Sequence, residues 1–440
     1  MSSEELVSPI LCPPSWPLVR LKDVAKKIGS GATPTGGQAA YQAARTGFAL
    51  VRSQNVFDRA FSEAGLAFIS DDQAEGLRNV RLQKDDLLLN ITGDGVTFGR
   101  ACKVPNNVLP ACVNQHVSII RLDQDRADSG YILSYLTHPL VKEYVEAFNA
   151  GGSRRAITKA HIESFVVPLP ALETQKWISS TLAALDDRIT LLRETNATLE
   201  AIAQALFKSW FVDFDPVRAK MEGRAPEGMD EATAALFPDG FEESELELVP
   251  KGWLPVRLDS FMELAYGKAL KAEHREHGPV PVYGSGGITG WHSSSLVDHA
   301  SVIVGRKGTV GSIYWESRPF YPIDTVFYVK SKLPLSYCHQ VLKTLGLHGM
   351  NTDAAVPGLN RENVYRLLVP GASLPLIGAF DEIVRSLRAG IDRNEGQAQT
   401  LATLRDTLLP RLISGQLRLT DASSQSVKTR SGTLSSNSLV

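Results

Sequence analysis

The sequence predicts an α+β protein built from two pseudo-repeated α/β parts, each followed by one long helix. Three observations predict this class. Residues 157–213 and 359–415 align without a gap at a constant offset of 202. Both segments carry a heptad pattern of apolar residues. Short β-rich runs, separated by glycine, aspartate and asparagine turns, precede each of them. An internal repeat of this kind indicates the architecture of the whole chain, which no single motif does.

The repeat is one of pattern more than of identity. Val167 and Pro168 fall on Val369 and Pro370, and the apolar positions of the following helix fall on one another in the same way. A weaker similarity occurs at the start of each half, where Val-Arg-Leu is found at 19–21 and again at 256–258. Each half is therefore a variable stretch of about 150 residues followed by a helix.

In the first half, residues 48–51, 86–89 and 117–120 have the β-branched and leucine-rich composition of buried strands. A single helix is expected near 130–148. A glycine-rich loop, a short helical turn and a strand ending in Pro-Leu-Pro follow. In the second half the glycine-rich segments 283–291 and 304–312 are expected to be loops between strands.

The heptad segments predict two rods of about 60 Å, at ~1.5 Å per residue. One amphipathic helix cannot bury its apolar stripe alone, so the two helices pair either with each other or with a partner's helix. Asn196 and Asn394 lie on the seam, where they either fix its register or are merely tolerated. The seam positions are Ile178, Leu182, Leu185, Ile189, Leu192, Asn196, Leu199, Ala203, Leu206 and Trp210, then Phe380, Val384, Leu387, Ile391, Asn394, Ala398, Leu401, Arg405, Leu408 and Leu412.

These patterns divide the chain into six segments. Pro216 is expected to end the first helix. Residues 221–249 hold nine acidic side chains and one basic one, so we expect an acidic linker there. The Ser/Thr-rich C-terminus is expected to be disordered. The segments are a first α/β domain (1–170), a first long helix (171–220), the linker (221–250), a second α/β domain (251–370), a second long helix (371–419) and the tail (420–440).

The composition is that of a globular protein without a membrane span. Hydrophobic residues make up 43% of the chain, no apolar run reaches 18 residues, and the N-terminus has no signal-peptide pattern. Four cysteines lie far apart, which favours reduced thiols in a cytosol. The net charge of −2 neither requires nor excludes nucleic acid, because residues 251–370 alone hold 13 basic against nine acidic side chains.

Catalytic signatures are absent from the sequence. It contains no P-loop, no Glu-x-Lys or Asp-x-Lys nuclease tripeptide, no Asn/Asp-Pro-Pro-Tyr/Phe methyltransferase motif and no His-Glu-x-x-His helix. His274 and His277 favour an exposed polar turn over a metal site, because no third ligand is near in sequence. We therefore expect no catalytic residue and no metal, and interpret the chain as a binder.

Several loops carry side chains suited to DNA. Arg can hold guanine, and Gln or Asn can hold adenine, through two hydrogen bonds each. Arg52, Gln54 and Asn55 close a strand; their alternative is a loop capping its own turn. Arg100 belongs to a glycine loop whose backbone could approach a phosphate closely; the alternative is a plain hairpin turn. Gln115 precedes a strand and could reach a groove; the alternative is a strand-edge cluster. These five residues lie in three separate loops of the first half.

Further candidates suit phosphate. Arg154, Arg155 and Lys159 follow two glycines, with a solvated surface as the alternative. Arg306 and Lys307 stand between glycines and are the best phosphate or guanine candidates of the second half. Tyr283 and Ser285 on the neighbouring loop could stack or hydrogen-bond, although core packing is an equal alternative for Tyr283.

In its repeat, its heptads and these loops, the chain resembles the DNA-specificity subunit of type I restriction–modification systems over nearly its whole length. Trp16 to Gly37 resembles the opening of the family's target-recognition domain. The junction AITKAHIESFVVPLPALETQKWISSTLAALDDRI is the most diagnostic stretch. FALVRSQNV, LLLNITGDGVTFGRACKV, VNQHVSIIRL and FKSWFVDFDPVRAK resemble further family segments, as do VPVYGSGGITGWHS and VIVGRKGTVGSIYW of one class of recognition domain.

The resemblance implies two target-recognition domains separated by two long antiparallel coiled-coil helices, each domain reading one half of a split DNA target. It implies two adenine methyltransferase (modification) subunits that dock on the helices, and restriction subunits, in a bacterial or archaeal cytoplasm. S-adenosylmethionine, ATP and Mg²⁺ would belong to those partners. One departure is that Glu173-Thr174-Gln175 carries the family's Glu/Gln feature, whereas the second copy has Leu374 to Ile377 instead.

Three hypotheses remain open at this stage. The first is the DNA-binding specificity subunit. The second is an enzyme, a methyltransferase or nuclease with degenerate motifs, which would methylate DNA alone. The third is a scaffold whose helices pair with another protein and whose globular parts no longer read DNA; it would enrich no sequence from random duplexes.

Overall fold

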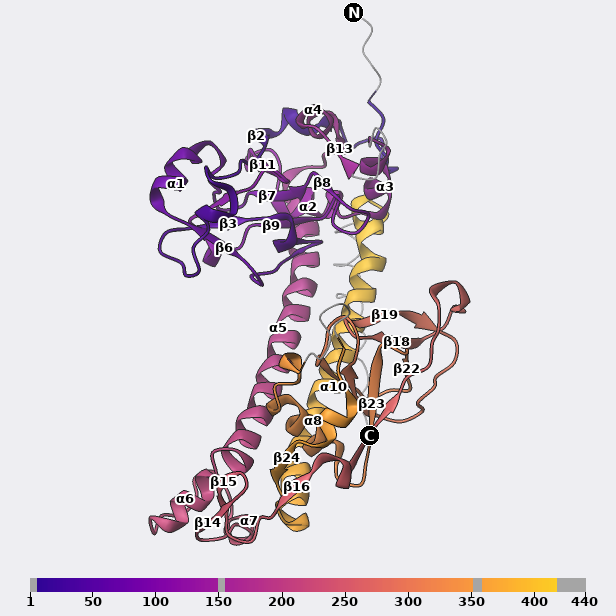
Figure 1. Cartoon of the computed structure of the whole chain (residues 1–440). Helices are drawn as coiled ribbons and strands as arrows, with labels where there is room; N and C mark the ends of the chain where they lie inside the picture. The colour runs from indigo at the N-terminus through magenta and orange to yellow at the C-terminus, as the bar shows by residue number, and fades with distance from the viewer. Residues whose placement is uncertain (1–5, 149–154, 351–357, 418–440) are drawn as a thin grey trace, which may run out of the picture. The chain divides into compact units, whose positions relative to one another are not determined.

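The computed structural model describes residues 6–148, 155–350 and 358–417. The chain forms two compact units, one of residues up to Leu191 together with those from Ala398, the other of residues from Leu192 to Gln397. Two helices of 40 residues, α5 (Leu172–Phe211) and α10 (Leu374–Ile413), therefore contribute one half each to both units. Figure 1 shows the chain and labels many of the elements of both units.

The globular part of the first unit is built on two sheets. A four-stranded antiparallel sheet has the order β2-β11-β7-β9, and a three-stranded sheet has the order β10-β3-β6 with β10 parallel to β3. These strands are β2 (Ala25–Ser30), β3 (Phe48–Val51), β6 (Ala67–Ile69), β7 (Leu87–Asn90), β9 (Ala101–Lys103), β10 (Ala111–Val113) and β11 (Val117–Leu122). The shorter strands are β1 (Leu18–Arg20), β4 (Val56–Phe57), β5 (Ala60–Phe61), β8 (Thr92–Gly93), β12 (Arg155–Ala156) and β13 (Val166–Pro168). The helices are α1 (Asp71–Gly76), α2 (Ser129–Leu136), α3 (Pro139–Ala147) and α4 (Lys159–Ser164).

The second unit repeats this topology. Its four-stranded sheet has the order β17-β23-β20-β21, and its three-stranded sheet has the order β19-β18-β22, again with one parallel pair. The strands are β16 (Pro255–Arg257), β17 (Met262–Tyr266), β18 (Val280–Gly284), β19 (Gly287–His292), β20 (Ser301–Gly305), β21 (Ile313–Glu316), β22 (Tyr321–Pro322), β23 (Val326–Ser331) and β24 (Leu368–Pro370). The helices are α8 (Leu335–Thr344) and α9 (Arg361–Tyr365).

Individual backbone contacts recur between the units. The amide of Ile157 donates to the carbonyl of Ile91 at 3.0 Å, and the amide of Leu359, 202 residues later, donates to Arg306 at 2.8 Å. Gly31 and Gly267 follow equivalent strands, and a Cβ on either would lie 2.2 or 2.1 Å from a backbone oxygen. Only glycine fits at such a close approach of two backbones. The predicted pseudo-repeat is therefore confirmed, and it extends beyond the segments that align in sequence.

Within each unit the halves of α5 and α10 pair in opposite directions. In the first unit Arg405 of α10 contacts Asp186 of α5 at 2.9 Å. In the second, the amide nitrogen of Asn394 donates to the amide oxygen of Asn196 at 2.8 Å. Most of the predicted seam is buried, including Ile178, Leu182, Ile189, Leu192, Ala203, Trp210, Phe380, Val384, Ile391 and Leu412. The helices thus pair with each other in each unit, and the α+β class with two long antiparallel helices is confirmed.

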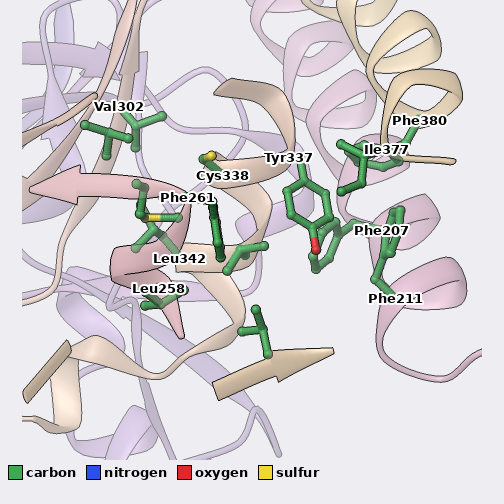
Figure 2. Packing of buried hydrophobic residues seen from close by; sticks show 14 of the residues in the cluster. Phe207, Phe211, Leu258, Phe261, Val302, Tyr337, Cys338, Leu342, Ile377 and Phe380 are labelled. Atoms are coloured by element: carbon green, nitrogen blue, oxygen red, sulfur yellow. The ribbon is translucent and has the colours of Figure 1, made fainter. Parts of the chain in front are cut away.

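Each unit buries its own core against its helix halves. In the second unit α5 presents Phe207 and Phe211, which meet Tyr337 of α8 and Phe380 of α10 with ring centroids 5.2 to 5.7 Å apart. Figure 2 shows these rings beside Leu258, Phe261 and Leu342 of the globular part. Within the described ranges, no helix is both long and apolar enough to cross a bilayer.

Four sequence-based expectations about elements were wrong. The glycine-rich segment 283–291 is not a loop, because it contains the end of β18, a turn at 285–286 and most of β19. The helix near 130–148 is two helices, because Pro139 holds the preceding residue, His138, in an extended conformation. Pro216 does not end the long helix, which stops at Phe211; it lies in the first turn of α6 (Asp215–Met221), where a proline is tolerated. The segment predicted as a linker contains α7 (Glu231–Ala235) and a hairpin of β14 (Phe241–Ser244) and β15 (Glu247–Pro250). The tail (420–440), for which disorder was expected, lies outside the described residues.

Candidate nucleic-acid interface

The loops that carry most first-half candidates meet at one end of the first unit. The side chain of Asn90, at the end of β7, donates to the carbonyl of Ser53 after β3 at 3.0 Å. The hydroxyl of Thr33, after β2, donates to the amide oxygen of Gln115 before β11 at 3.0 Å. Strands β8 and β12 pair beside them. Because these strands share one sheet end, residues distant in sequence form one polar surface.

Arg52, Gln54 and Asn55 have different roles on this surface. Gln54 is exposed and its amide donates to the carbonyl of Gly65 at 3.2 Å. Arg52 is half-buried, lies over the ring of Tyr41 at 5.4 Å and also bonds to Gly65 at 2.5 Å. Asn55 is fully buried: it accepts from the Arg52 amide and donates to Ser62. As a base contact Asn55 is a wrong prediction, because its amide is used in capping its own turn.

Gln115 is exposed at the tip between β10 and β11, where its amide oxygen accepts from Thr33. The backbone of Arg100 lies beside the end of β7, where its carbonyl accepts from the amide of Asn90 at 2.9 Å. Its guanidinium packs over the ring of Phe57, on the hairpin of β4 and β5, at 4.6 Å from the ring centroid. Arg100 is half-buried and Gln115 is exposed, and both remain candidates.

The basic loop of the first unit is partly neutralised. Arg155 pairs with Glu146 at 2.6 Å and lies against Gly95. Lys159 is exposed in the first turn of α4 and approaches Glu163 at 3.4 Å, a pair that water screens strongly. Arg154 lies outside the described residues. Arg155 would therefore have to leave Glu146 to bind a phosphate, whereas Lys159 is exposed and only weakly paired.

In the second unit the turn between β18 and β19 lies against the glycine-rich loop that follows β20. The amide of Thr309 donates to the hydroxyl of Ser285 at 3.3 Å, and the hydroxyl of Ser312 donates to the Ser285 carbonyl at 2.6 Å. Arg306 donates to the carbonyl of Asp324 at 3.1 Å, while Lys307 is exposed beside it. Ser285, Arg306 and Lys307 are therefore brought together, and they occupy the end of the sheet that corresponds to the first unit's polar surface.

Tyr283 is a wrong prediction as a DNA contact. Its ring is buried and its hydroxyl donates to the Glu316 carboxylate at 3.0 Å. Burial, together with that carboxylate, raises the pKa of Tyr283 well above its ordinary value. Arg318 compensates the charge of Glu316 at 3.0 Å. The side chain belongs to the interior, which is the alternative that the sequence left open.

Two residues of the second surface were missed. Tyr266, at the end of β17, is 49% exposed, and Arg361 opens α9. The guanidinium groups of Arg306 and Arg361 both lie 5.0 Å from the centre of the Tyr266 ring. The repeat offset of 202 could have found Arg361, since it places that residue on Lys159. No pattern marked Tyr266, because its neighbours come together only in three dimensions.

A charged network joins the globular part of the second unit to its helix halves. Glu200 of α5 contacts Lys343 of α8 at 2.6 Å and Arg388 of α10 at 2.5 Å. Burial alone would raise the pKa of Glu200, but Lys343 and Arg388 outweigh it and hold that pKa at about 2. His339, buried beside them, has its pKa lowered by burial and by Lys343. Arg388 also lies over Trp315 at 4.8 Å.

The first unit has a smaller counterpart. Asp186 of α5 accepts from Arg59 of the globular part at 2.7 Å and from Arg405 of α10 at 2.9 Å. In both units a carboxylate of α5 thus joins a cation of the globular part to a cation of α10. Buried ion pairs of this kind hold a definite geometry because breaking one leaves an uncompensated charge.

The sequence difference between the start of α5, which has Gln175, and the start of α10, which lacks an equivalent glutamine, has a structural reason. Gln175 is buried, accepts from the amide of Asp128 at 3.0 Å and donates to the carbonyl of Pro170 at 2.8 Å. At the equivalent position the second copy has Ile377, which is buried in the apolar core. There, Ser336 donates to Asp381 at 2.6 Å and links α8 to α10 instead. A polar contact therefore also holds the start of α10, but other residues supply it.

Comparison with known proteins agrees with this architecture. Residues 13–201 match the family model of the type I restriction modification DNA specificity domain. The HindI specificity subunit of Haemophilus influenzae is 25% identical, covering 83% of this chain and 94% of that protein. The MjaIX specificity subunit of Methanocaldococcus jannaschii is 22% identical, covering 92% and 94%. The crystal structure of the type I S subunit from M. genitalium covers 92% of this chain and 98% of that chain, with a TM-score of 0.50 at 16% identity, and supports the fold.

The two repeated α/β parts each carry a polar loop surface at the equivalent end of the unit. Residues 13–201 match the type I restriction modification DNA specificity domain, and the chain is similar over most of its length to specificity subunits of type I restriction enzymes. Across the described ranges, no three metal-ligating side chains gather into a group that could hold an ion.

Proposed function

We propose that this chain reads a bipartite duplex DNA target, one part with each unit, and performs no catalysis of its own. The observation that carries the proposal is the repeated strand order, with loops rich in Arg, Lys and Gln at the equivalent end of both sheets. Side chains of this kind read base edges and neutralise phosphates. Two similar readers in one chain suit a target with two separate parts.

Helices α5 and α10 supply the second element of the proposal. Each helix contributes a half to both units, so the helix length sets how far apart the two target parts can lie. The spacer between the target parts would be nonspecific in sequence and defined in length. Its length then follows from geometry and not from base contacts.

The chain would act by positioning other subunits. Two methyltransferase subunits would dock on the helical regions, where Leu191, Ile202 and Leu404 are large apolar side chains left about half exposed. They would bind S-adenosylmethionine and methylate an adenine that they flip out of the duplex. Restriction subunits would bring ATP and Mg²⁺. In a bacterial or archaeal cytoplasm these partners would form the complete enzyme.

The test is a selection from random duplexes with the full-length chain, alone and with its methyltransferase subunit. Enrichment of a split motif, and methylation only when the second subunit is present, is the expected result. Methylation by the chain alone would favour the enzyme hypothesis. If no split motif is enriched in either form, the scaffold hypothesis replaces the proposal.

A further inference from the structure

Two arginines share one tyrosine ring at the polar surface of the second unit. Tyr266 ends β17, Arg306 follows β20 and Arg361 is the first residue of α9, so three separate elements converge here. Each guanidinium lies 5.0 Å from the centre of the Tyr266 ring. The ring itself is 49% exposed, so the group stands at the surface and not in the core.

Both arginines are held in place by further contacts. Arg306 donates to the carbonyl of Asp324 at 3.1 Å and lies 5.7 Å from the ring centre of Phe327. Arg361 lies 5.5 Å from the ring centre of Tyr365. Its Nε is buried and has no hydrogen-bond partner among the described residues. The adjacent Glu362 is 3.5 Å away and 63% exposed, so it neutralises Arg361 only weakly.

Stacking on an aromatic ring changes what an arginine can recognise. A free arginine or lysine meets a phosphate in many orientations, because the contact requires only charge. A stacked guanidinium keeps its plane and presents its donors as a fixed fork. That fork matches the O6 and N7 acceptors of guanine in the major groove. Lys307, exposed and unstacked beside it, suits a phosphate instead.

We propose that Tyr266 orients Arg306 and Arg361 to read guanine, so that the target part bound by the second unit contains at least one G·C pair. The inference rests on the proposed function and deepens it by assigning a base to a cluster. Tyr266 is a positioning residue in this scheme, since it acts through the two arginines. The charge of the arginines contributes to affinity, whereas their fixed plane contributes to specificity.

The experiment compares four variants of the full-length chain in selections from random duplexes. Arg361→Lys and Arg306→Lys keep the charge but lose the planar fork. Tyr266→Ala removes the stacking surface, and Tyr266→Phe, the matched control, retains it. In one target part only, the lysine variants and Tyr266→Ala should lower the preference for guanine by about tenfold at one or two positions. Tyr266→Phe should retain the preference, and the other target part should not change in any variant.

Two further measurements distinguish the outcomes. The slope of affinity against salt concentration should be the same in Arg361→Lys as in the unaltered chain, because the phosphate charges are retained. Thermal unfolding of each variant checks that the unit is folded. A split motif without guanine in the affected part, or an even loss of affinity over all sequences, would overturn this inference while leaving the proposed function intact. Failure of the unaltered chain to enrich any split motif would defeat both.

Discussion

Replacing Glu200 by glutamine should destabilise the second unit, because this carboxylate is the acceptor for two cations from two other helices. Lys343 and Arg388 approach it at 2.6 and 2.5 Å, and the carboxylate is about one-fifth exposed. Glutamine keeps the shape but removes the charge, and one of its two polar atoms becomes a donor facing a cation. Lys343, Arg388 and the buried His339 would then share no negative partner within this network.

The magnitude follows from the pKa of Glu200. Burial acts to raise it, but the cations lower it from 4.5 to about 2. Each pKa unit corresponds to about 1.4 kcal/mol, so the charged form is favoured by about 3 kcal/mol. This agrees with the ~3–5 kcal/mol measured when one partner of a buried ion pair is removed. A lowered carboxyl pKa contributes stability above the unfolded value, near pH 4.5, and this contribution is lost as the pH falls toward the folded value.

Urea unfolding of the full-length chain at pH 7, followed by tryptophan fluorescence, measures the effect; Trp315 lies against Arg388 and reports on the network. With a slope of ~1–3 kcal/mol per M, the midpoint of the affected transition should fall by roughly 1 M or more. Glu194→Gln is the matched control, since Glu194 is exposed on the same helix. Equal midpoints for Glu200→Gln and Glu194→Gln would refute the reasoning.

Three further predictions follow from other contacts. Asn196→Ala and Asn394→Ala should each cost about 1–3 kcal/mol by leaving the other amide unpaired, and strict additivity in a double-mutant urea-unfolding cycle would contradict the pairing. Burial lowers the pKa of His339, so the folded second unit keeps this side chain neutral and should lose about 1.4 kcal/mol of stability per pH unit below pH 6.5. In denaturation measured against pH, His339→Phe should flatten this dependence, whereas a change at the exposed His348 should not. Gly267→Ala should cost ~1–3 kcal/mol in thermal unfolding because its Cβ would lie 2.1 Å from the carbonyl of Ile323, while Gly286→Ala, whose nearest neighbour is 3.9 Å away, should be close to neutral.

The periodic features of the chain could be predicted from its sequence. A heptad pattern over 40 residues depends only on local spacing, so the extent of α5 and α10 and most buried seam positions could be read directly. The glycine turns and β-rich runs likewise indicated the strands. Pro216 was misread because a proline is compatible with both the end of one helix and the first turn of the next.

The candidate site was predicted only in part, because it is assembled from loops distant in sequence. The composition of a loop indicates which side chains could reach DNA, but not which way they point. Asn55 and Tyr283 carry suitable groups, but those groups form hydrogen bonds within the protein, to Ser62 and Glu316. Tyr266 became visible only when the fold placed Arg306 and Arg361 against its ring. The Glu200 network depends on the packing of three helices and has no sequence signature.

The most direct test of the central proposal changes the length of the paired helices. Seven residues inserted after Leu192 in α5 and before Ala398 in α10 preserve the heptad and add about 10 Å to each helix. At ~3.4 Å per base pair this corresponds to roughly three base pairs. The inserted chain should select the same two target parts with a spacer about three base pairs longer. An equal insertion after the exposed Gly223 should leave the spacer as it is. If the helix insertions also leave the spacer unchanged, α5 and α10 do not set the distance between the readers.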